Sequence, residues 1–345
     1  MRKVLIISGI FIALFVLFVP AVAVGATARP ERPIYVIIVT IDGCRPDSLL
    51  EASTPNIDEI VQDAAYSWSA QTVYPSKTPQ AHASLFTGAL PGVHRYTGPG
   101  SRLETETIFQ VFEGAGYKTA LVDGKGGRIA GLEVGVSYVK NNVDYRWRNG
   151  AVYQPGYEDP NGDIRVMENA IQIFVENQPT LMFILLPVVD VTGHIYSHTS
   201  HNYLQAIERA DQAIGMLVDN LKGLGIYENT LLVIVSDHGM TGTDHGSQDP
   251  GDMSILLIFS GPGVRVGKFE GGKIIDVAPT VTALFGLRAP ANAEGRNLFA
   301  EEPIPLFYVG IAMAAVMVCV AYVLVRRRRA REVPQPASAA VEASG

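Results

Sequence analysis

The sequence predicts an α/β domain whose central sheet is mainly parallel and is flanked by helices. Two observations carry this prediction. Short runs rich in Val, Ile and Leu alternate with longer amphipathic segments, and acidic residues follow three of these runs directly. Uninterrupted apolar runs are typical of strands covered on both faces, and their alternation with helices indicates a parallel sheet between helical layers.

Five segments have the composition of buried strands, and four segments between them have a helical pattern. We interpret Ile34–Ile41, Leu181–Pro187 and Thr230–Ser236 as buried parallel strands, with Ile255–Ser260 as a fourth and Lys118–Val122 as a fifth. The helices are Thr54–Ala65, Glu106–Ala115, Ile164–Glu176 and Asn202–Leu221. At the start of the first helix we expect the Thr54 hydroxyl to cap the N-terminus, because proline follows at the first helical position.

Both ends of the chain carry apolar runs of about 20 residues, the length that spans a bilayer. In residues 1–28 a basic pair, an apolar run and small residues follow one another, which predicts a signal peptide or an uncleaved signal anchor. Residues 304–325 predict a transmembrane helix, because four arginines follow at Arg326 and act as a stop-transfer signal. The expected topology is a cell-membrane protein with one C-terminal span, an extracytoplasmic domain at 29–303 and a disordered cytoplasmic tail within 326–345.

The net charge and the cysteine content limit the partners and the disulfide bonds that we expect. Residues 29–303 hold 20 basic and 32 acidic residues, a net charge near −12. Such a surface repels a nucleic-acid backbone, so we expect no polymeric nucleic acid as a partner. The chain has two cysteines, Cys44 and Cys319, and the second lies in the predicted span. No disulfide framework is expected.

Acidic residues follow three predicted strands at the point where each strand ends. Asp42 follows the first strand, Asp190 the second and Asp237 the third. Because sites in open α/β sheets form at the carboxyl ends of strands, we expect these carboxylates to meet at one edge.

Histidines accompany two of these carboxylates. His194 comes four residues after Asp190, His238 directly follows Asp237, and His245 comes soon after. Carboxylate and imidazole are the ligand set that Zn²⁺ prefers, with Mn²⁺ or Fe as alternatives. Each motif alone also fits a hydrogen-bonded surface turn, but their convergence at strand ends predicts a metal centre.

A nucleophile is available in the stretch from Tyr74 to Gly88. Thr78 precedes a proline, which suits a helix N-terminus, where backbone N–H groups and the helix dipole favour an anion. A coordinated metal ion would ionise this hydroxyl for attack on phosphorus.

These segments resemble the alkaline phosphatase superfamily and, within it, the type I phosphodiesterase/nucleotide pyrophosphatase family. The matching segments are Val39–Asp47, Thr54–Ile57, Tyr74–Thr78 with Thr87-Gly88, Asp190–His194, Ser236–Met240, and His245-Gly246 leading to Gly261–Gly263. The resemblance covers essentially all of the outward domain. It implies an alkaline-phosphatase-like sandwich and a metal-dependent hydrolase of small phosphate esters, foremost a phosphodiesterase or nucleotide pyrophosphatase.

The resemblance also implies roles by position. Two divalent ions, foremost Zn²⁺, would be held by two ligand sets: Asp190, His194 and His245 for one ion, and Asp42, Asp237, His238 and the Thr78 oxygen for the other. Attack by Thr78 would give a phospho-enzyme that water then hydrolyses.

Two basic residues are candidate substrate contacts. The loop containing Lys125 and Arg128 faintly resembles the lysine-bearing loop of phosphonoacetate hydrolases, and the alternative is an exposed basic turn. We interpret His82 as structural, and His198 and His201 as surface residues.

Other functions of the same fold stay open to different degrees. A sulfatase needs a Cys or Ser nucleophile followed by Pro and Arg, which Thr78-Pro79-Gln80 lacks. The terminal apolar runs disfavour a cytoplasmic phosphomutase. A phosphomonoesterase or a phosphonate hydrolase fits the same ligands, and the non-enzyme alternative is a surface protein that its metals stabilise.

Overall fold

The computed structural model describes residues 32–141, 161–300 and 306–331. The chain forms two compact units, Met1–Phe299 and Ala300–Gly345. The predicted signal segment at 1–28 and the tail beyond Arg331 lie outside the described residues.

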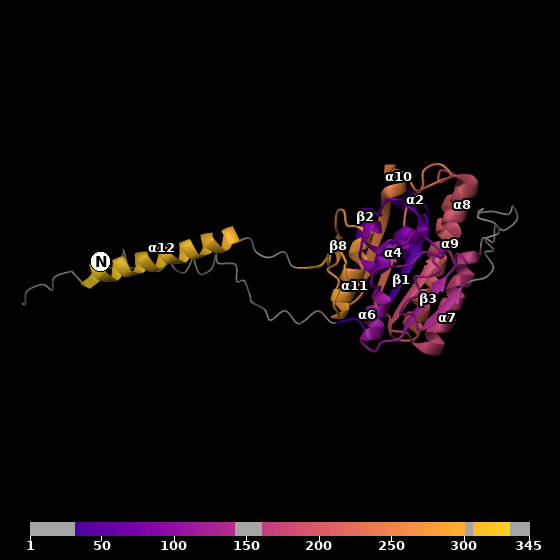
Figure 1. Cartoon of the computed structure of the whole chain (residues 1–345). Helices are drawn as coiled ribbons and strands as arrows, with labels where there is room; N and C mark the ends of the chain where they lie inside the picture. The colour runs from indigo at the N-terminus through magenta and orange to yellow at the C-terminus, as the bar shows by residue number, and fades with distance from the viewer. Residues whose placement is uncertain (1–31, 142–160, 301–305, 332–345) are drawn as a thin grey trace, which may run out of the picture. The chain divides into compact units, whose positions relative to one another are not determined.

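The first unit is built on an eight-stranded sheet (Figure 1). The strand order across the sheet is β4-β3-β5-β1-β6-β7-β2-β8. The strands are β1 (Tyr35–Ile41), β2 (Ala64–Gln71), β3 (Thr119–Asp123), β4 (Tyr138–Asn141), β5 (Leu181–Leu186), β6 (Thr230–Val235), β7 (Ser254–Ser260) and β8 (Gly267–Lys268). All five predicted strands are present, as β1, β5, β6, β7 and β3.

Strand β7 is the exception to the mainly parallel arrangement of the described strands. It pairs antiparallel with both β6 and β2, whereas the pairs β4–β3, β3–β5, β5–β1, β1–β6 and β2–β8 are parallel. The expectation that residues 255–260 add another parallel strand is therefore wrong. The chain from Ser236 to Met253 does not cross back over the sheet, so β7 begins at the edge where β6 ends.

Helices cover both faces of the sheet (Figure 1). The described helices of the first unit are α2 (Pro46–Glu51), α3 (Pro55–Gln62), α4 (Thr78–Thr87), α5 (Pro91–His94), α6 (Ile108–Gly114), α7 (Gly162–Asn177), α8 (Val188–Tyr196), α9 (His201–Gly223), α10 (Pro250–Met253) and α11 (Val277–Phe285), with short 3₁₀ turns at Tyr227–Asn229 and Ile274–Asp276.

Alternate residues of β1 separate the interior into two cores, because successive side chains of a strand point to opposite faces. Ile37, Val39 and Ile41 pack with α2, α3, α7, α8 and α9. Val36 and Ile38 pack with α4, α6 and α11. The uninterrupted apolar sequence of β1 thus reflects burial on both faces.

The first predicted helix is only partly right. It was expected over 54–65, but α3 ends at Gln62, and residues from Ala64 onward form β2. Thr54 does occupy the N-cap of α3, yet its side chain makes no capping hydrogen bond. The Asp211 carboxylate of α9 accepts hydrogen bonds from the Asn56 and Ile57 amides instead. A residue distant in sequence has replaced the expected local cap.

The described part of the second unit is a single helix, α12 (Leu306–Arg331). Its stretch Gly310–Arg328 is long and apolar enough to cross a membrane by length and composition. This agrees with the predicted span at 304–325. Whether the helix lies in a membrane stays a prediction.

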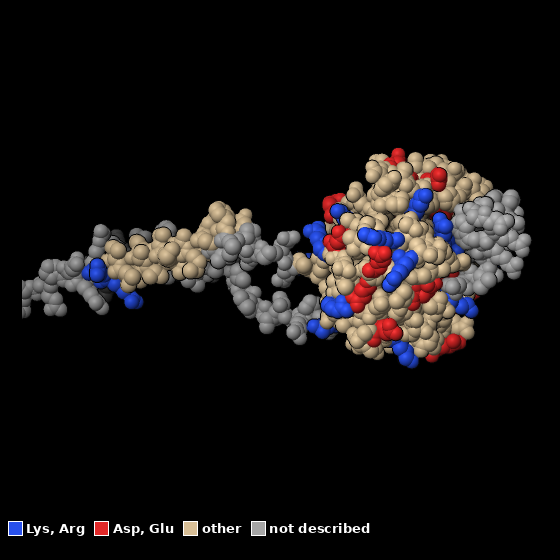
Figure 2. Space-filling view, viewed as in Figure 1, with Lys and Arg blue, Asp and Glu red and all other residues tan. Residues whose placement is uncertain are grey.

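The visible surface of the first unit mixes charges of both signs (Figure 2). On that face, Lys and Arg side chains lie among Asp and Glu side chains and form no continuous basic stripe.

The buried imidazole of His94 makes folding stability sensitive to acid. Its Nδ1 accepts a hydrogen bond from the Tyr96 amide, which requires the neutral ring. Burial lowers the pKa of His94 from 6.5 to about 4. The unfolded chain therefore binds a proton below pH 6.5 that the folded protein rejects until about pH 4. Stability present above pH 6.5 is lost as the pH falls toward 4, by roughly 2 to 3 kcal/mol.

We predict that His94→Gln reduces this loss. The free energy of unfolding is measured in urea for the wild type and the variant at pH 7, 5.5 and 4, with a chelator present in both series. All other titrating groups are shared, so the difference between the curves isolates His94. Curves that stay parallel from pH 7 to 4 would contradict the prediction.

Candidate metal centre

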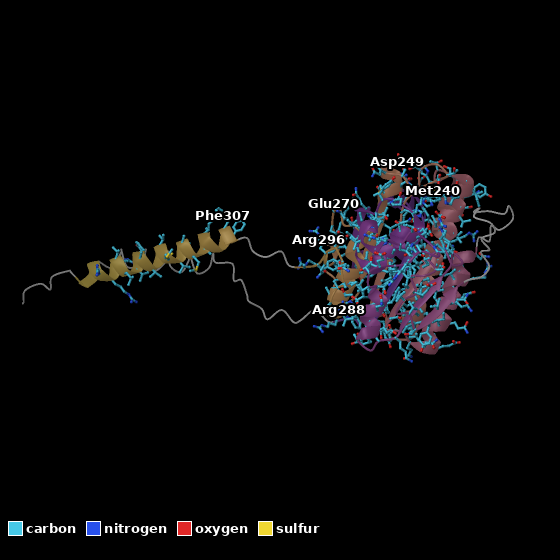
Figure 3. All side chains as sticks on the ribbon, in the orientation of Figure 1. Met240, Asp249, Glu270, Arg288, Arg296 and Phe307 are labelled. Carbon is cyan, nitrogen blue, oxygen red and sulfur yellow. The ribbon has the colours of Figure 1, made fainter. Side chains whose placement is uncertain are left out.

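Three strands deliver acidic residues to one edge of the sheet. Asp42 follows β1, Asp190 lies in the first turn of α8 just after β5, and Asp237 follows β6. Because β5, β1 and β6 are adjacent and parallel, their carboxyl ends coincide. Figure 3 shows Met240 and Asp249, from the chain after β6, at one end of this unit beside α10, and Arg288 at the other end.

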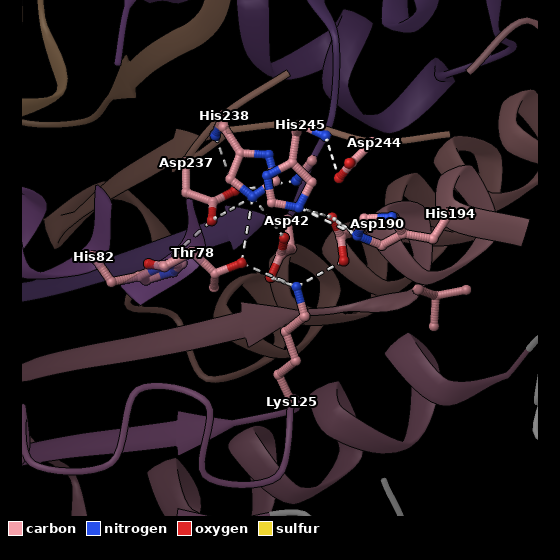
Figure 4. Close-up of polar contacts among 12 residues, drawn as sticks. Asp42, Thr78, His82, Lys125, Asp190, His194, Asp237, His238, Asp244 and His245 are labelled. Carbon is pink, nitrogen blue, oxygen red and sulfur yellow. Dashed lines mark hydrogen bonds and ion pairs between the residues drawn. The ribbon is translucent and has the colours of Figure 1, made fainter. Parts of the chain in front are cut away.

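Helix α4 brings Thr78 to the same place. Thr78 is the first residue of α4 and is almost fully buried, as predicted for a helix N-terminus before proline. Its Oγ1 lies 3.3 Å from His238 Nε2 and 3.1 Å from Lys125 Nζ. The predicted nucleophile therefore lies among the predicted ligands (Figure 4).

The first cluster consists of Asp190, His194 and His245. Asp190 Oδ1 lies 3.4 Å from His194 Nε2 and 3.3 Å from His245 Nε2, and the two imidazole nitrogens are 3.2 Å apart. Tetrahedral bonds of about 2.0–2.1 Å to zinc separate ligand atoms by roughly 3.3 Å. The three atoms therefore have the spacing of one face of a zinc tetrahedron.

The second cluster is arranged around His238. Its Nε2 lies 3.5 Å from Asp42 Oδ1, 3.4 Å from Asp237 Oδ2 and 3.3 Å from Thr78 Oγ1. Asp190 also lies close enough to Asp42 and His238 to share an ion with them. These distances fit the predicted second ligand set, with Asp190 adjoining both clusters.

The three histidines present the same nitrogen to the clusters. In each ring Nδ1 lies 2.8 Å from a backbone carbonyl: Thr243 for His194, Gly239 for His238 and Ser76 for His245. A carbonyl only accepts hydrogen bonds, so Nδ1 is the protonated nitrogen, and the lone pair of the neutral ring is on Nε2. Such outer hydrogen bonds orient histidines that bind metals.

The donor atoms that face these clusters fit a pair of metal ions. Asp42 Oδ1, Asp190 Oδ1 and Asp237 Oδ2 are buried and have no hydrogen-bond partner among the described residues. A buried carboxylate oxygen without a partner is costly unless a cation compensates it. In each cluster carboxylate oxygens and imidazole nitrogens converge, which is the donor set of zinc sites.

Lys125 lies between the two clusters. Its ammonium is 2.8 Å from Asp42 Oδ2, 2.7 Å from Asp190 Oδ2 and 3.1 Å from Thr78 Oγ1. Burial alone would lower the pKa of Lys125, but the carboxylates of Asp190 and Asp42 outweigh it and raise the pKa. Lys125 is therefore a buried permanent cation, and the alternative of an exposed basic turn is wrong for this residue.

One lysine compensates the two carboxylates unequally. Burial, together with the charge of Asp237, raises the pKa of Asp42 to about 6. For Asp190, burial is outweighed by Lys125 and the neighbouring histidines, so its pKa falls below the ordinary value. Burial also raises the pKa of Asp237 and lowers the pKa of His245 to about 4. The raised pKa values of Asp42 and Asp237 show that the ionised forms of these two carboxyls need further positive charge nearby.

A glycine lets the β1 and β5 ends approach each other. Gly43 follows Asp42 with a φ of 68°, and its amide donates a hydrogen bond to Asp237 Oδ1. A Cβ atom at this position would lie 2.9 Å from Asp190 Cβ. Only glycine permits this backbone conformation together with the close contact.

The remaining predicted histidines belong to neither cluster, although His82 Nδ1 lies 3.4 Å from Asp237 Oδ2 (Figure 4). The His82 Nδ1 donates to the Thr78 carbonyl, and its ring packs between Phe86 and Phe183, which agrees with a structural role. His201 begins α9 and is exposed, and His198 contacts the Gly242 carbonyl.

Arg128 lies near Tyr96. Burial raises the pKa of that phenol, and the charge of Arg128 opposes the rise. A role for Arg128 in substrate binding stays a prediction.

Asp123 is a site residue that the sequence reasoning missed. Its two carboxylate oxygens accept hydrogen bonds from the Lys125 and Gly127 amides, which fixes the loop that carries Lys125. Asp123 is the last residue of β3, which is parallel to β5. The rule that singled out Asp42 and Asp237, an acidic residue where a parallel strand ends, would have identified it too.

Known proteins resemble the chain in sequence. A family model described as type I phosphodiesterase / nucleotide pyrophosphatase matches residues 36–267. An uncharacterized pyrophosphatase/phosphodiesterase of Schizosaccharomyces pombe is 25% identical over 291 residues, which cover 78% of this chain and 59% of that protein. Human ectonucleotide pyrophosphatase/phosphodiesterase family member 1 is 26% identical over 255 residues, 67% of this chain and 26% of that protein. The chain thus spans between a quarter and three fifths of the length of these relatives.

A solved structure resembles the fold. The alkaline phosphatase PafA superposes with a TM-score of 0.66 at 13% identity, over 78% of this chain and 98% of that one. At this identity the likeness concerns the fold alone. It confirms the predicted alkaline-phosphatase-like sandwich.

We predict that each cluster binds one zinc ion, and that a substitution in one cluster releases the ion of that cluster alone. His245→Ala and His238→Ala should each retain about one zinc ion, because each removes a ligand from one cluster. His198→Ala is the matched control and should retain two, since His198 also contacts a backbone carbonyl but belongs to neither cluster. Zinc per protein is measured by atomic absorption after dialysis. Two ions retained by His245→Ala would show that the first cluster is assigned wrongly.

Proposed function

The chain belongs to the type I phosphodiesterase / nucleotide pyrophosphatase family, and from this premise we propose that it is a metal-dependent phosphodiesterase whose nucleophile is Thr78. The observation that carries the proposal is the position of the Thr78 hydroxyl. It lies within 3.5 Å of a predicted ligand nitrogen and of the Lys125 ammonium, at the positive end of α4.

The proposed reaction has two displacements at phosphorus. In the first, a bond forms between Thr78 Oγ1 and phosphorus, the bond to the leaving alkoxide breaks, and the proton lost from the Thr78 hydroxyl balances the one that the alkoxide gains to leave as the alcohol. In the second, the oxygen of water attacks the same phosphorus, the bond to Thr78 Oγ1 breaks, and a proton from the water restores the threonine hydroxyl. Lys125 stabilises the ionised threonine oxygen in both steps, because its ammonium already donates toward that atom.

Two divalent ions, most suitably zinc, would be held by Asp190, His194 and His245 and by Asp42, Asp237, His238 and Thr78. When bound, such ions supply Lewis acidity that lowers the pKa of the threonine hydroxyl and offsets charge on the phosphoryl oxygens. The imidazole tautomers and the unpartnered carboxylate oxygens described above support this assignment.

Charge balance favours a diester over a monoester. Three carboxylates and an ionised Thr78 carry four negative charges, which two divalent ions neutralise. The remaining charge among these groups is that of Lys125, which matches the single negative charge of a phosphodiester. A phosphomonoester carries a charge closer to −2 at neutral pH and leaves the buried centre with an excess negative charge.

We infer that α12 anchors the protein in the cell membrane with the catalytic unit outside the cytoplasm. The apolar stretch Gly310–Arg328 and the arginines at its C-terminal end support this arrangement. The small phosphate-ester substrate would then be extracytoplasmic.

The full-length protein in detergent tests the activity. Matched nitrophenyl substrates, a phosphodiester, a phosphomonoester and a sulfate monoester, are compared by kcat/KM with and without a chelator. A chelator-sensitive preference for the diester supports the proposal. Preference for the monoester or the sulfate would reassign the chemistry within the same fold, and zinc binding without any turnover would favour a non-catalytic or phosphonate-directed protein.

We predict that Thr78→Ala lowers kcat for the diester by about 10³-fold or more, because no other hydroxyl replaces the nucleophile. Asp42, Asp237 and His238 remain in this variant to hold the second ion, so the zinc content and the unfolding temperature should stay near those of the wild type. Thr78→Ser is the control and should retain measurable turnover. Thr78→Ala with wild-type kcat would exclude Thr78 as the nucleophile.

We predict that Lys125→Met lowers kcat/KM for the diester by about 10- to 100-fold, which corresponds to the loss of a hydrogen bond to a charged group. It should also destabilise the chelator-treated protein by about 3 kcal/mol, since Asp42 and Asp190 lose their buried partner. Lys125→Arg should recover part of both. If Lys125→Met had the kcat/KM and the free energy of unfolding of the wild type, Lys125 would have no role in the mechanism.

A further inference from the structure

Helix α8 carries two of the predicted ligands but does not cap its own N-terminus. Asp190 is its third residue and His194 its seventh. The residue before it is Pro187, and no side-chain capping bond forms there. The first N–H groups of a helix have no partner within the helix, so a partner must come from elsewhere.

Asp163 of α7 supplies that partner. Its Oδ1 accepts a hydrogen bond from the Val188 amide, the first N–H of α8, at 3.1 Å. The side chain is completely buried, and Oδ2 has no hydrogen-bond partner among the described residues. Burial raises the pKa of Asp163 to about 7, and the negative charge of Asp42 contributes to the rise. Burial therefore destabilises the ionised form of Asp163, and the hydrogen bond from the Val188 amide of α8 compensates for only part of this cost.

The connection from Asp163 to the first cluster is short. Val188, whose amide Asp163 binds, lies two residues before Asp190. Asp190 directs Oδ1 toward His194 and His245 and Oδ2 toward Lys125. Because Asp190 and His194 lie one turn apart on α8, a shift of the first turn displaces both ligands relative to His245, which comes from a different segment.

We propose that Asp163 is a positioning residue for the cluster of Asp190, His194 and His245: by fixing the first turn of α8, it sets the spacing of the ligand atoms. The inference rests on the proposed function, since it takes these residues as metal ligands. It assigns Asp163 no contact with the substrate or the metal.

The protein contains a matched control for this arrangement. Asp211 of α9 is also buried, and it caps α3 from a distance through the Asn56 and Ile57 amides. Helix α3 carries no residue of either cluster. Replacing Asp211 with alanine thus removes a helix cap of the same kind from a helix that carries no predicted ligand.

The test measures zinc binding of the full-length protein in detergent, for the wild type, Asp163→Ala, Asp163→Asn and Asp211→Ala. Zinc affinity is determined by competition with a chromogenic chelator, and unfolding temperatures are recorded in parallel. Loss of an outer partner of a metal ligand typically weakens affinity by about 10- to 100-fold. We expect Asp163→Ala to lower the affinity for one of the two zinc ions by that amount. The affinity for the other ion should stay within about threefold of the wild-type value.

The two other variants separate positioning from general destabilisation. Asp163→Asn should bind both ions nearly as the wild type does, because its amide oxygen still accepts from Val188. Asp211→Ala should lower the unfolding temperature and keep both zinc affinities.

Three outcomes would overturn the inference. They are unchanged zinc affinities in Asp163→Ala, an equal loss of affinity for both zinc ions in that variant, or a loss of zinc affinity in Asp211→Ala as large as that in Asp163→Ala. Zinc-binding data for Asp163→Asn decide the question if Asp163→Ala does not fold, since an affinity loss as large as 100-fold there would contradict rescue by the retained acceptor. A wild-type protein that binds no zinc would instead contradict the proposed function itself.

Discussion

Three carboxylates buried within a few ångströms of one another are the constraint on which this domain depends. Asp42, Asp190 and Asp237 are shielded from water, and among the described residues Lys125 is the buried cation that contacts two of them. Transferring a charge into a protein interior costs several kcal/mol unless it is paired and hydrogen-bonded. The adjacent parallel strands and the glycine after Asp42 concentrate negative charge where divalent cations would neutralise it, and the carbonyl-bound histidines direct Nε2 lone pairs to the same place.

Much of this centre could be predicted from the sequence because its signals are local. An acidic residue directly after an apolar run is visible without knowledge of the fold, and parallel strands then bring Asp42, Asp190 and Asp237 together. The same holds for Thr78, whose position before proline identifies a helix N-terminus. Strand identity was equally accessible, since burial on both faces leaves an uninterrupted apolar run.

Asp123 was missed despite a local signal, but the other features that escaped prediction depend on partners distant in sequence. The direction of β7 follows from the path of residues 236–253 rather than from its own composition. The capping of α3 by Asp211 and of α8 by Asp163 joins residues of different helices. Lys125 was recognised as a basic residue in a loop, but its burial between Asp42 and Asp190 follows only from the packing of β3 beside β5.

The antiparallel pairing of β6 and β7 has a consequence for the order in which the domain assembles. The segment between these strands contributes Asp237, His238 and His245, yet neither cluster is complete without Asp42 or Asp190. Strand β2, although early in the chain, pairs with β7 and β8 and must wait for both. Both clusters need residues of the segment after β6, so a growing chain cannot complete either of them before that segment has been made. Ions bound there would favour the folded domain over the unfolded chain by mass action.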